Sequence, residues 1–497
     1  MFHYIFAKDE ISYIAIAQRY ADGNVSTAVN AYWAPLLSWL IAIPIALGVS
    51  PFWSAKLVTV AIGLFTLISV RALASAFDVD RPLRRFLDVV LVPMLVFASL
   101  AFVTPDLLLV GLLALYFSVV FDRDYARRRW AGVACGVLGA LSFFCKQYAF
   151  FFFLGHLVVM TGVHCALGPD ATTRRRVLRH GLSALAVFSA LVLAWVGMLH
   201  HKYDRLMLGV NGTYNYAIVG PDSPGRPIFY FGFVAPPDAR ATSVWEEPYY
   251  FSSRVRSWSP VDSLPALKHQ LKLVVQNLER TVDVFQTFSV FTAAILTGGL
   301  LLCIAGLGVL RERLAIVAAL LTIALYPLGY LPVHSEERYL WPMFPLLVLM
   351  GSVLVSVLFG SHFFASQLRR RALIALFGLS LLVHPLAELC RRANDGRDVA
   401  AIAEQLEGSG LEHAKLASNA PDYNASVVVA YHLNAKYYGM ARQGATEEQV
   451  VDELQYHHIE YYLAWEGQPM TSAALERARE VRGKTRVLTI YKVRPSH

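Results

Sequence analysis

The chain contains few charged residues for its length. Asp, Glu, Lys and Arg together make up 16% of the 497 residues, whereas hydrophobic residues make up 56%. Soluble domains ordinarily contain about 25% charged residues, so this sequence cannot cover a protein of this size with a hydrated surface. The composition therefore excludes a soluble globular protein and indicates a polytopic α-helical membrane protein.

Cysteine is also scarce, and the net charge is modest. None of the five cysteines forms a CxxC pair, which argues against a disulfide framework and a zinc ribbon. The net charge of +8 comes largely from arginines in short loops between apolar segments, where they set membrane topology and do not indicate a nucleic-acid partner. We interpret the cysteines as packing residues: Cys135, Cys145, Cys165, Cys303 and Cys390.

Long apolar segments are abundant. About 20 apolar residues are needed to cross a bilayer as a helix, and ten segments approach or reach that length. An earlier apolar stretch at 33–49 is interrupted by Pro35 and Pro44, and we predict that it is re-entrant or interfacial. The ten predicted spans are 54–77, 87–103, 107–121, 130–145, 148–167, 182–199, 285–310, 314–331, 340–359 and 372–389.

Arginine-rich loops alternate with other loops along these spans, which predicts an orientation. Cytoplasmic loops carry an excess of Lys and Arg, so the loops containing these arginines are expected to be cytoplasmic. The opposite, external side would then receive Asp106, Lys146, the long loop at about 200–284, the turn 334–338 and the tail after Cys390. The basic loops lie at 81–85, 123–129, 174–179, 311–313 and 369–371.

The tail has a different pattern from the rest of the chain. Residues 397–406 and 447–455 read as helices, whereas 415–418, 427–431, 459–465 and 486–493 read as strands. We therefore predict two parts: a transmembrane domain at 1–390, which includes an external acidic segment at 1–32, and a small extracytoplasmic α/β domain at 391–497.

The acidic pair Asp9-Glu10 precedes the first apolar segments. Apolar residues from 11 to 21 recur at steps of three and four, which predicts a short amphipathic helix at 11–20 along the membrane surface. The two carboxylates would then lie at the mouth of a membrane-embedded cavity. The eight residues before Asp9 are too few for a span or a signal peptide. Either the acidic segment is the external N-terminus, or a first helix is missing before it.

An ordered series of short motifs resembles the GT-C glycosyltransferases over nearly the whole chain. Within that superfamily the chain is most similar to the protein O-mannosyltransferase and lipid A aminoarabinose transferase group. One departure is Lys56, where family members often carry an arginine. The motifs are Asp9-Glu10 with Tyr13, Ala17 and Gly23; Pro35, Leu36 and Trp39; Asp106 and Lys146 at span ends; and Glu337, Arg338, Tyr339, Pro342 and Pro345 in a late turn.

The resemblance implies a reaction and its participants. It implies an inverting enzyme of the inner (plasma) membrane that moves one sugar from a polyprenyl-phosphate carrier to an acceptor hydroxyl of a lipid, glycan or protein. Such an enzyme has to deprotonate the acceptor, hold the sugar and neutralise the departing phosphate. No cofactor is required with certainty, although a divalent metal is an option.

The implied roles fall on residues of the predicted external side. Asp9 is the candidate general base, Glu10 would orient the acceptor or hold a metal, and Asp106 would be a second acid. The candidates for the donor phosphate are Lys56, Lys146 and Arg338; those for substrate contacts are Tyr13, Trp39, Glu337 and Tyr339; and those for a metal are His334 and Glu336.

Each role has a structural alternative. The acidic pair and Asp106 could serve only as helix caps, and the cations could extend to the membrane surface without binding a ligand. The alternative function is a saccharide flippase or secondary transporter, which would ordinarily show repeated halves and charges near the bilayer midplane. This chain shows no repeat, and its candidate charges cluster at one boundary. A catalytically inactive scaffold is a third interpretation.

Overall fold

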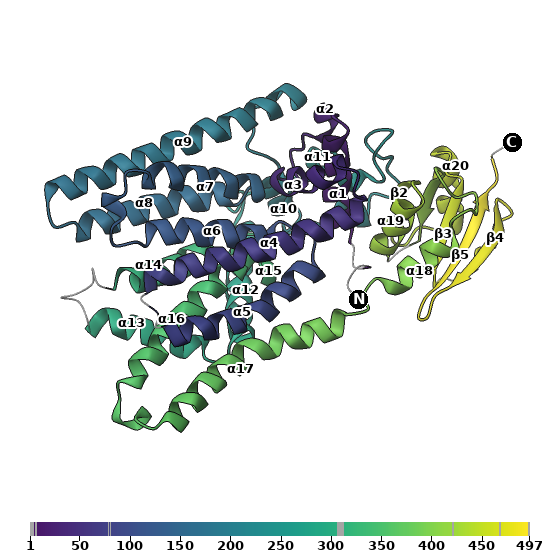
Figure 1. The fold of residues 1–497 in the computed structure, drawn as a ribbon. Helices are drawn as coiled ribbons and strands as arrows, with labels where there is room; N and C mark the ends of the chain where they lie inside the picture. The colour runs from purple at the N-terminus through teal and green to yellow at the C-terminus, as the bar shows by residue number, and fades with distance from the viewer. Residues whose placement is uncertain are drawn as a thin grey trace.

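The computed structural model describes residues 4, 7–77, 79, 81–305, 313–419, 422–466 and 469–495. Figure 1 shows a bundle of long helices with a small α/β domain at one end. The chain is mostly helical and ends in a five-stranded sheet. The predicted fold class, a polytopic helical protein with a C-terminal α/β domain, is confirmed.

Five helices in the described part of the chain are long and apolar enough to cross a membrane. They match the predicted spans 54–77, 148–167, 182–199, 340–359 and 372–389. They are α4 with η1 (Pro51–Phe77), α8 (Ala149–Leu167), α9 (Ala171–Tyr203), α15 to α16 (Glu337–Phe359) and the helix that begins at Gln367, which contains α17 (Gln367–Arg392).

Four other predicted spans correspond to helices that are short or partly charged. Helices α6 (Asp106–Val120) and α7 (Ala131–Cys145) have 15 residues each, and α14 (Leu314–Leu325) has 12. At about 1.5 Å per residue, each is shorter than a bilayer core. Helix α5 (Arg81–Ala101) has 21 residues but carries charges in its first half.

The predicted span 285–310 is wrong as a single helix. Helix α12 (Leu264–Phe288) is separated from α13 (Thr292–Ala305) by a short break, and the two are bent by 97° relative to each other. The apolar run starts inside α12, so composition alone did not reveal the bend at Ser289. Residues 306–310 lie outside the described residues.

Glycines allow two of the bundle helices to approach closely. A Cβ atom on Gly132 of α7 would lie 2.6 Å from the His180 carbonyl oxygen of α9, and one on Gly136 would lie 2.5 Å from that of Ala184. Two small residues spaced by four on one helix face are typical of close membrane-helix packing. The α7–α9 pair therefore depends on both glycines.

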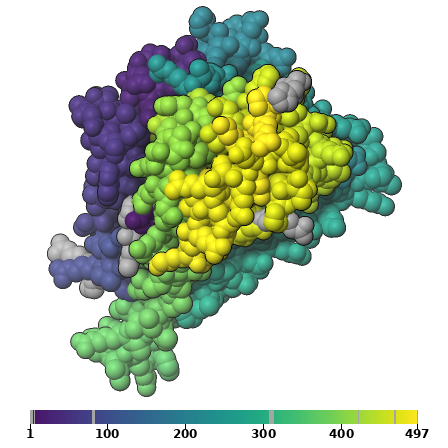
Figure 2. All heavy atoms as spheres, turned by 90° about the vertical axis from the view of Figure 1, so that its right-hand side faces the viewer, coloured from purple at the N-terminus to yellow at the C-terminus, as the bar shows by residue number. Residues whose placement is uncertain are grey.

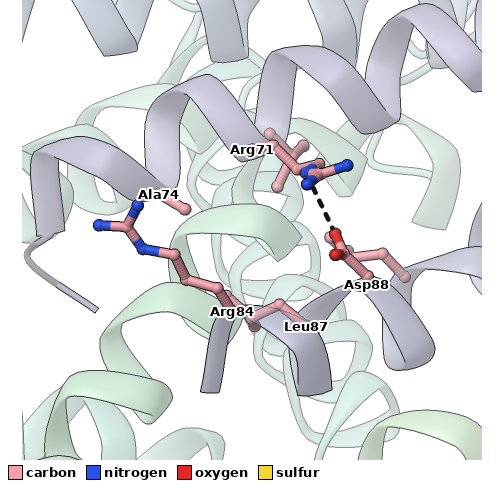
Figure 3. Close-up of a pocket in the computed structure, with 7 residues that line it drawn as sticks. Arg71, Ala74, Arg84, Leu87 and Asp88 are labelled. Atoms are coloured by element: carbon pink, nitrogen blue, oxygen red, sulfur yellow. Dashed lines mark ion pairs between the residues drawn. The ribbon is translucent and has the colours of Figure 1, made fainter. Parts of the chain in front are cut away.

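The basic loops gather at one end of the bundle. In Figure 1 the connections α4–α5, α6–α7, α8–α9 and α16–α17 lie at the end opposite the C-terminal domain. The same end holds a cavity of about 230 Å³ between α4 and α5, where Arg71 and Asp88 pair at 3.4 Å (Figure 3). Arg311 and the side chain of Arg81 lie outside the described residues.

The N-terminal segment forms three helices at the other end of the bundle: α1 (Lys8–Ala21), α2 (Val25–Ala28) and α3 (Leu36–Ala46). The helix predicted at 11–20 is present, but it does not lie on a surface, because every residue from Ile11 to Ala17 is buried. It packs against α3, η4 (Val244–Glu246) and α19 (Tyr423–His432). Pro44 lies inside α3 and does not interrupt it; with 11 residues, α3 is too short to cross a membrane.

The C-terminal domain is a five-stranded sheet with the order β2-β1-β3-β5-β4. Strand β1 is parallel to β2 and β3, whereas β5 is antiparallel to β3 and β4. The elements are α18 (Arg397–Gln405), β1 (Lys415–Ser418), α19, β2 (Lys436–Met440), α20 (Glu447–Tyr456), β3 (Tyr461–Trp465), β4 (Leu475–Arg482) and β5 (Val487–Val493).

Most of the tail was predicted correctly, with one error of type. The helices at 397–406 and 447–455 and the strands at 415–418, 459–465 and 486–493 are confirmed. Residues 427–431 form part of helix α19 and not a strand; the Asp422 carboxylate accepts a hydrogen bond from the Ala425 N–H and starts this helix. The valine run 427–429 is buried there, so tertiary packing overrides its preference for strands. Strands β2 and β4 were missed.

The long loop between α9 and α12 joins the bundle to the C-terminal domain. It contains α10 (Asn211–Ala217), η3 (Pro227–Phe229), η4 and α11 (Tyr249–Ser252). The Val234 N–H donates to the Tyr438 carbonyl at 2.7 Å, and the Tyr437 N–H donates to the Thr242 carbonyl at 2.7 Å. The loop therefore covers the β2 edge of the sheet. Figure 2 shows the C-terminal domain, in yellow, covering this end of the molecule.

Candidate active site

Charged side chains from distant parts of the sequence meet at the end of the bundle that faces the C-terminal domain. Asp9 lies in the first turn of α1, Asp106 is the first residue of α6, and Lys146 follows the last residue of α7. Glu336 and Arg338 belong to the turn that begins α15. Because each residue lies at a helix end, the packing of four helices brings them together.

Arg338 is the centre of this group. Its Nε atom donates to Glu336 Oε2 at 2.9 Å, Nη2 lies 3.6 Å from Asp9 Oδ2, and Nη1 lies 3.8 Å from Asp106 Oδ2. The planar guanidinium has five N–H donors in a fixed fork, so one side chain can hold three carboxylates in fixed relative positions.

Asp9 is one of the carboxylates that line a cavity. Its Oδ1 atom accepts a hydrogen bond from the Trp245 indole N–H at 2.8 Å and lies 3.5 Å from Lys8 Nζ. Burial raises the pKa of Asp9, but the charges of Lys8 and Arg338 and the indole hydrogen bond outweigh burial and lower that pKa overall. Asp9 is therefore held in its ionised form.

Glu10 lines the same cavity, but its carboxylate is occupied by backbone hydrogen bonds. Its carboxylate accepts hydrogen bonds from the backbone N–H of Ala7, which starts α1, and from that of Val103 at 3.1 Å. Burial raises the pKa of Glu10, and the charge of Lys56 opposes that rise. The capping alternative thus describes Glu10 well, whereas Asp9 has no capping contact among the described residues.

Lys56 and Lys146 do not reach the cavity. Lys56 Nζ donates to the Leu100 carbonyl at 3.0 Å. Lys146 Nζ lies 2.6 Å from Asp106 Oδ1 and 3.6 Å from the centre of the Tyr339 ring. Neither these two lysines nor Asp106 is among the described residues that line the cavity. Asp106 and Lys146 lie behind Arg338 and support it.

The cavity next to Asp9 has a volume of about 480 Å³. Its walls come from α1, α5, α12, α15, η7 (Trp341–Met343), α17 and α19 and from the loop residue Arg226, so both domains contribute. Four of its cations, Lys8, Arg226, Arg280 and Arg392, and its amide, Asn424, were not predicted as site residues. The charged and amide residues that line it are Lys8, Asp9, Glu10, Arg226, Arg280, Glu336, Glu337, Arg338, Glu388, Arg392 and Asn424.

The remaining predicted residues have mixed positions. Glu337 lines the cavity, and its Oε1 atom lies 3.3 Å from His384 Nε2. Tyr339 stacks on Tyr330 and lies under Lys146. Tyr13 is buried against Trp33, with ring centres 5.0 Å apart. Trp39 packs among Tyr20, Phe144 and Trp195, which is a structural contact.

A metal centre is not formed by the described side chains. His334 Nε2 lies 3.2 Å from Glu336 Oε1, and both side chains are of types that bind metals. In the described ranges, however, no group of three His, Cys, Asp or Glu side chains could hold a metal ion. Glu336 is instead bound by Arg338; although burial raises its pKa, the hydrogen bonds from His334 and Arg338 lower that pKa far below its ordinary value.

The support role of Lys146 leads to a stability prediction. The Asp106 side chain is only 4% exposed, so Lys146→Gln leaves a buried carboxylate with Arg338 as its remaining close cation. Breaking a buried pair in this way ordinarily costs about 3 to 5 kcal/mol. We expect a loss of this size in the free energy of unfolding, measured by denaturant titration in detergent micelles.

Matched variants distinguish the loss of the buried ion pair from the loss of any surface charge. Arg391→Gln breaks an ion pair with Glu388 in which the arginine is 61% exposed, and we expect a loss of less than about 1 kcal/mol. Adding Asp106→Asn to Lys146→Gln should recover part of the lost stability. Equal losses in Lys146→Gln and Arg391→Gln would contradict the assignment.

Comparisons with known proteins show what this fold resembles. No protein-family model matches the sequence, and no curated protein matches it. The fold, however, is similar to that of several solved structures.

Two of these structures match nearly the whole of this chain. The fold is similar to that of ArnT from Cupriavidus metallidurans bound to undecaprenyl phosphate, with a TM-score of 0.59, 13% identity and coverage of 98% of this chain and 94% of ArnT. It is also similar to the oligosaccharyltransferase AglB from Archaeoglobus fulgidus, with a TM-score of 0.52, 11% identity and coverage of 93% of this chain and 66% of AglB. At this identity the likeness establishes the fold.

Proposed function

We propose that the protein is a membrane glycosyltransferase that moves one sugar from a polyprenyl-phosphate carrier to an acceptor hydroxyl, with inversion at the anomeric carbon. The observation that carries this proposal is the Asp9 carboxylate, held between Arg338 and Trp245 at the wall of a cavity that five cations and five carboxylates line. A base beside a phosphate-binding surface is what such a transfer needs.

The residues suggest how one displacement would run. Asp9 accepts the proton of the acceptor hydroxyl while the acceptor oxygen forms a bond to the anomeric carbon. The bond between that carbon and the phosphate oxygen breaks, and both electrons leave with the polyprenyl phosphate. Arg338, Arg226 and Arg280 line the same cavity and would neutralise the departing phosphate. A single displacement inverts the configuration of the sugar.

The structural neighbours support the donor class. The ArnT structure was determined with undecaprenyl phosphate, and the AglB structure with a dolichol-phosphate and an inhibitory peptide. The donor of this protein, its acceptor and its inverting course are parts of our proposal. His334 and Glu336 remain a proposed site for a metal only if a ligand adds further donors.

The test separates a transferase from a flippase. The purified protein is placed in sealed vesicles with a polyprenyl-phosphate sugar and candidate acceptors. We expect free polyprenyl phosphate to accumulate in proportion to glycosylated acceptor. Passage of intact donor across the membrane, without cleavage of the sugar–phosphate bond, would replace our proposal with the transporter alternative.

The sidedness of the site is a further prediction. The basic loops and the C-terminal domain lie at opposite ends of the bundle in Figure 1, and basic loops face the cytoplasm. We expect a reporter fused after Leu389 to be active outside the cytoplasm of a bacterial cell and one fused at Arg128 to be active inside it. The same location for both reporters would contradict the proposed extracytoplasmic site.

A further inference from the structure

Trp245 contacts the candidate base from a loop more than 200 residues away in the sequence. Its indole N–H donates to Asp9 Oδ1 at 2.8 Å, while the other oxygen, Oδ2, faces Arg338 at 3.6 Å. An indole nitrogen only donates, so this contact favours the ionised carboxylate. With a different partner on each oxygen, the plane of the Asp9 carboxylate is fixed.

Trp245 is itself held on several sides. The residue is 1% exposed, and its ring packs against those of Tyr32, Trp33 and Tyr214. Its carbonyl oxygen accepts hydrogen bonds from the Ser12 hydroxyl at 3.3 Å and from the Trp33 indole at 3.1 Å. Both ends of the residue are therefore fixed against α1 and the segment that follows it.

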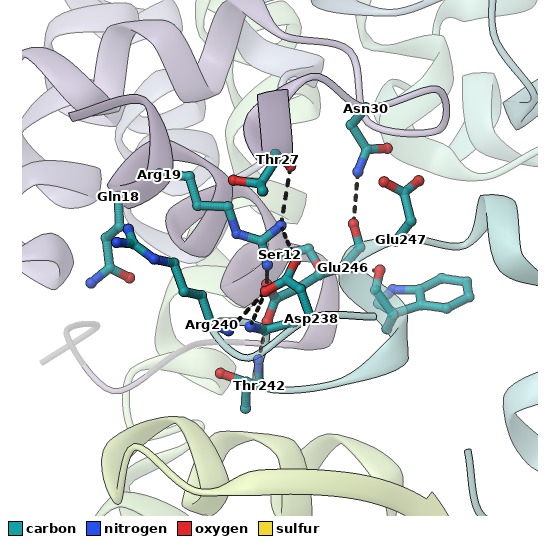
Figure 4. Close-up of polar contacts among 12 residues, drawn as sticks. Ser12, Gln18, Arg19, Thr27, Asn30, Asp238, Arg240, Thr242, Glu246 and Glu247 are labelled. Atoms are coloured by element: carbon teal, nitrogen blue, oxygen red, sulfur yellow. Dashed lines mark hydrogen bonds and ion pairs between the residues drawn. The ribbon is translucent and has the colours of Figure 1, made fainter. Parts of the chain in front are cut away.

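The next residue, Glu246, anchors the loop with a buried charge (Figure 4). It is 0% exposed, and its carboxylate pairs with Arg19 Nη2 at 2.5 Å and accepts the Thr242 N–H at 2.6 Å. Its carbonyl oxygen accepts from the Asn30 amide at 2.7 Å. Arg19 also lies 3.3 Å from Asp238, and neither Arg19 nor Glu246 is among the described residues that line the cavity.

A buried ion pair is weak support for stability alone, because desolvation of the two charges offsets their attraction. What this pair does fix is geometry: Arg19 belongs to the same helix as Asp9, and Glu246 is adjacent to Trp245. The pair therefore ties the indole donor and the carboxylate acceptor to one rigid frame. A one-ångström error in such a frame can cost about a hundredfold in rate.

We propose that Trp245 is a positioning residue for Asp9, and that the Arg19–Glu246 ion pair sets its position. This inference rests on the proposed function in so far as it concerns catalysis. The effect on Asp9 itself does not depend on that function, and it can be measured without turnover.

The first measurement follows the Asp9 carboxylate directly. Infrared difference spectra of the full-length protein, taken against Asp9→Asn, report the protonation of Asp9 as the pH is varied. The charged groups that face Asp9 are Lys8, Glu10, Arg226 and Arg338, with Asp106 and Glu336 behind Arg338. All of them remain in Trp245→Phe, which keeps an aromatic ring, removes the N–H donor and makes the side chain smaller.

Because the indole hydrogen bond lowers the pKa of Asp9, its removal should raise that pKa. We expect half-titration at a proton concentration about tenfold lower than in the wild type. Trp258→Phe is the matched control, since its indole N–H donates to the Tyr216 carbonyl at 2.8 Å in the same loop and has no contact with Asp9. An unchanged Asp9 titration in Trp245→Phe would overturn the proposal.

The second measurement concerns the ion pair. Glu246→Gln should shift the Asp9 titration in the same direction as Trp245→Phe and lower kcat by roughly tenfold, with little change in the KM for the donor. Arg240→Gln is the control, because Arg240 pairs with the exposed Asp22 at 2.9 Å in the same cluster. A merely structural pair would lower thermal stability and leave the Asp9 titration unchanged, which would refute a positioning role.

The two readouts distinguish the failure of this inference from the failure of the proposed function. If wild-type protein transfers no sugar while Trp245→Phe shifts the titration of Asp9, the function fails and the positioning of Asp9 stands. If transfer occurs and Trp245→Phe shifts the titration without lowering kcat, a catalytic role for the positioning is refuted.

Discussion

Asp9→Asn should lower sugar transfer by about a hundredfold to ten-thousandfold, which is the range for loss of a general base. The amide has nearly the shape of the carboxylate and can still accept the Trp245 hydrogen bond at Oδ1. It cannot accept the proton of the acceptor hydroxyl. The measurement is transfer by purified protein with a polyprenyl-phosphate sugar donor.

The pH dependence of transfer by the wild type also tests the role of Asp9. A carboxylate with a lowered pKa stays ionised above that pKa, and its base form is lost only as the pH falls through it. Asp9 has a lowered pKa, so transfer should persist at pH values at which an ordinary aspartate is already half protonated. A low pKa also means a weak base, so its contribution has to come from its position next to the acceptor.

The control for Asp9→Asn is the same substitution at Asp22, at the other end of α1. Asp22 follows the last residue of α1 and has a side chain that is 59% exposed, paired with Arg240. Asp22→Asn should transfer at the wild-type rate. Wild-type transfer by Asp9→Asn in a protein that inserts and folds normally would assign the base elsewhere, with Glu337 and Glu388 as the next carboxylates on the cavity wall.

The sequence predicted the class of fold because its strongest signals are local. Apolar runs and arginine-rich loops depend on composition over some 20 residues, and most of the resulting helices are present. The bend between α12 and α13 was missed because it changes direction without changing composition. Helix α19 was mistaken for a strand because its valines are buried by contacts with distant segments.

The candidate site was predicted in part for the same reason. Asp9, Asp106, Lys146 and Arg338 were found as charges at helix ends in an apolar chain, and they do meet. The sequence could not predict which of them line the cavity and which only support the others, because that depends on how the side chains pack. Trp245 had no signal in the sequence, because an aromatic cluster in a loop is also typical of an interfacial belt. Only the structure shows that its indole N–H donates to Asp9.

Arg338→Gln is the variant with the second largest expected effect. Glutamine can replace a hydrogen bond but not the charge that Asp9, Asp106 and Glu336 share. A hydrogen bond to a charged group contributes about 1.5 to 3 kcal/mol, so the affinity for undecaprenyl phosphate in detergent micelles should fall by roughly tenfold to a hundredfold. The pKa of Asp9 should rise, because Arg338 helps to lower it, and transfer should therefore be lost at a higher pH than in the wild type.

Two further substitutions test whether charge or geometry matters. Arg338→Lys keeps the charge as a single point, which cannot make the three separate contacts of the guanidinium, so it should recover only part of the affinity. Arg371→Gln removes an exposed arginine near the start of α17, and that start lies at the opposite end of the bundle (Figure 1). This variant should bind the lipid as the wild type does. If Arg338→Gln also binds as the wild type does, the phosphate site must lie with the other cations of the cavity, because Arg226, Arg280 and Arg392 line the same walls.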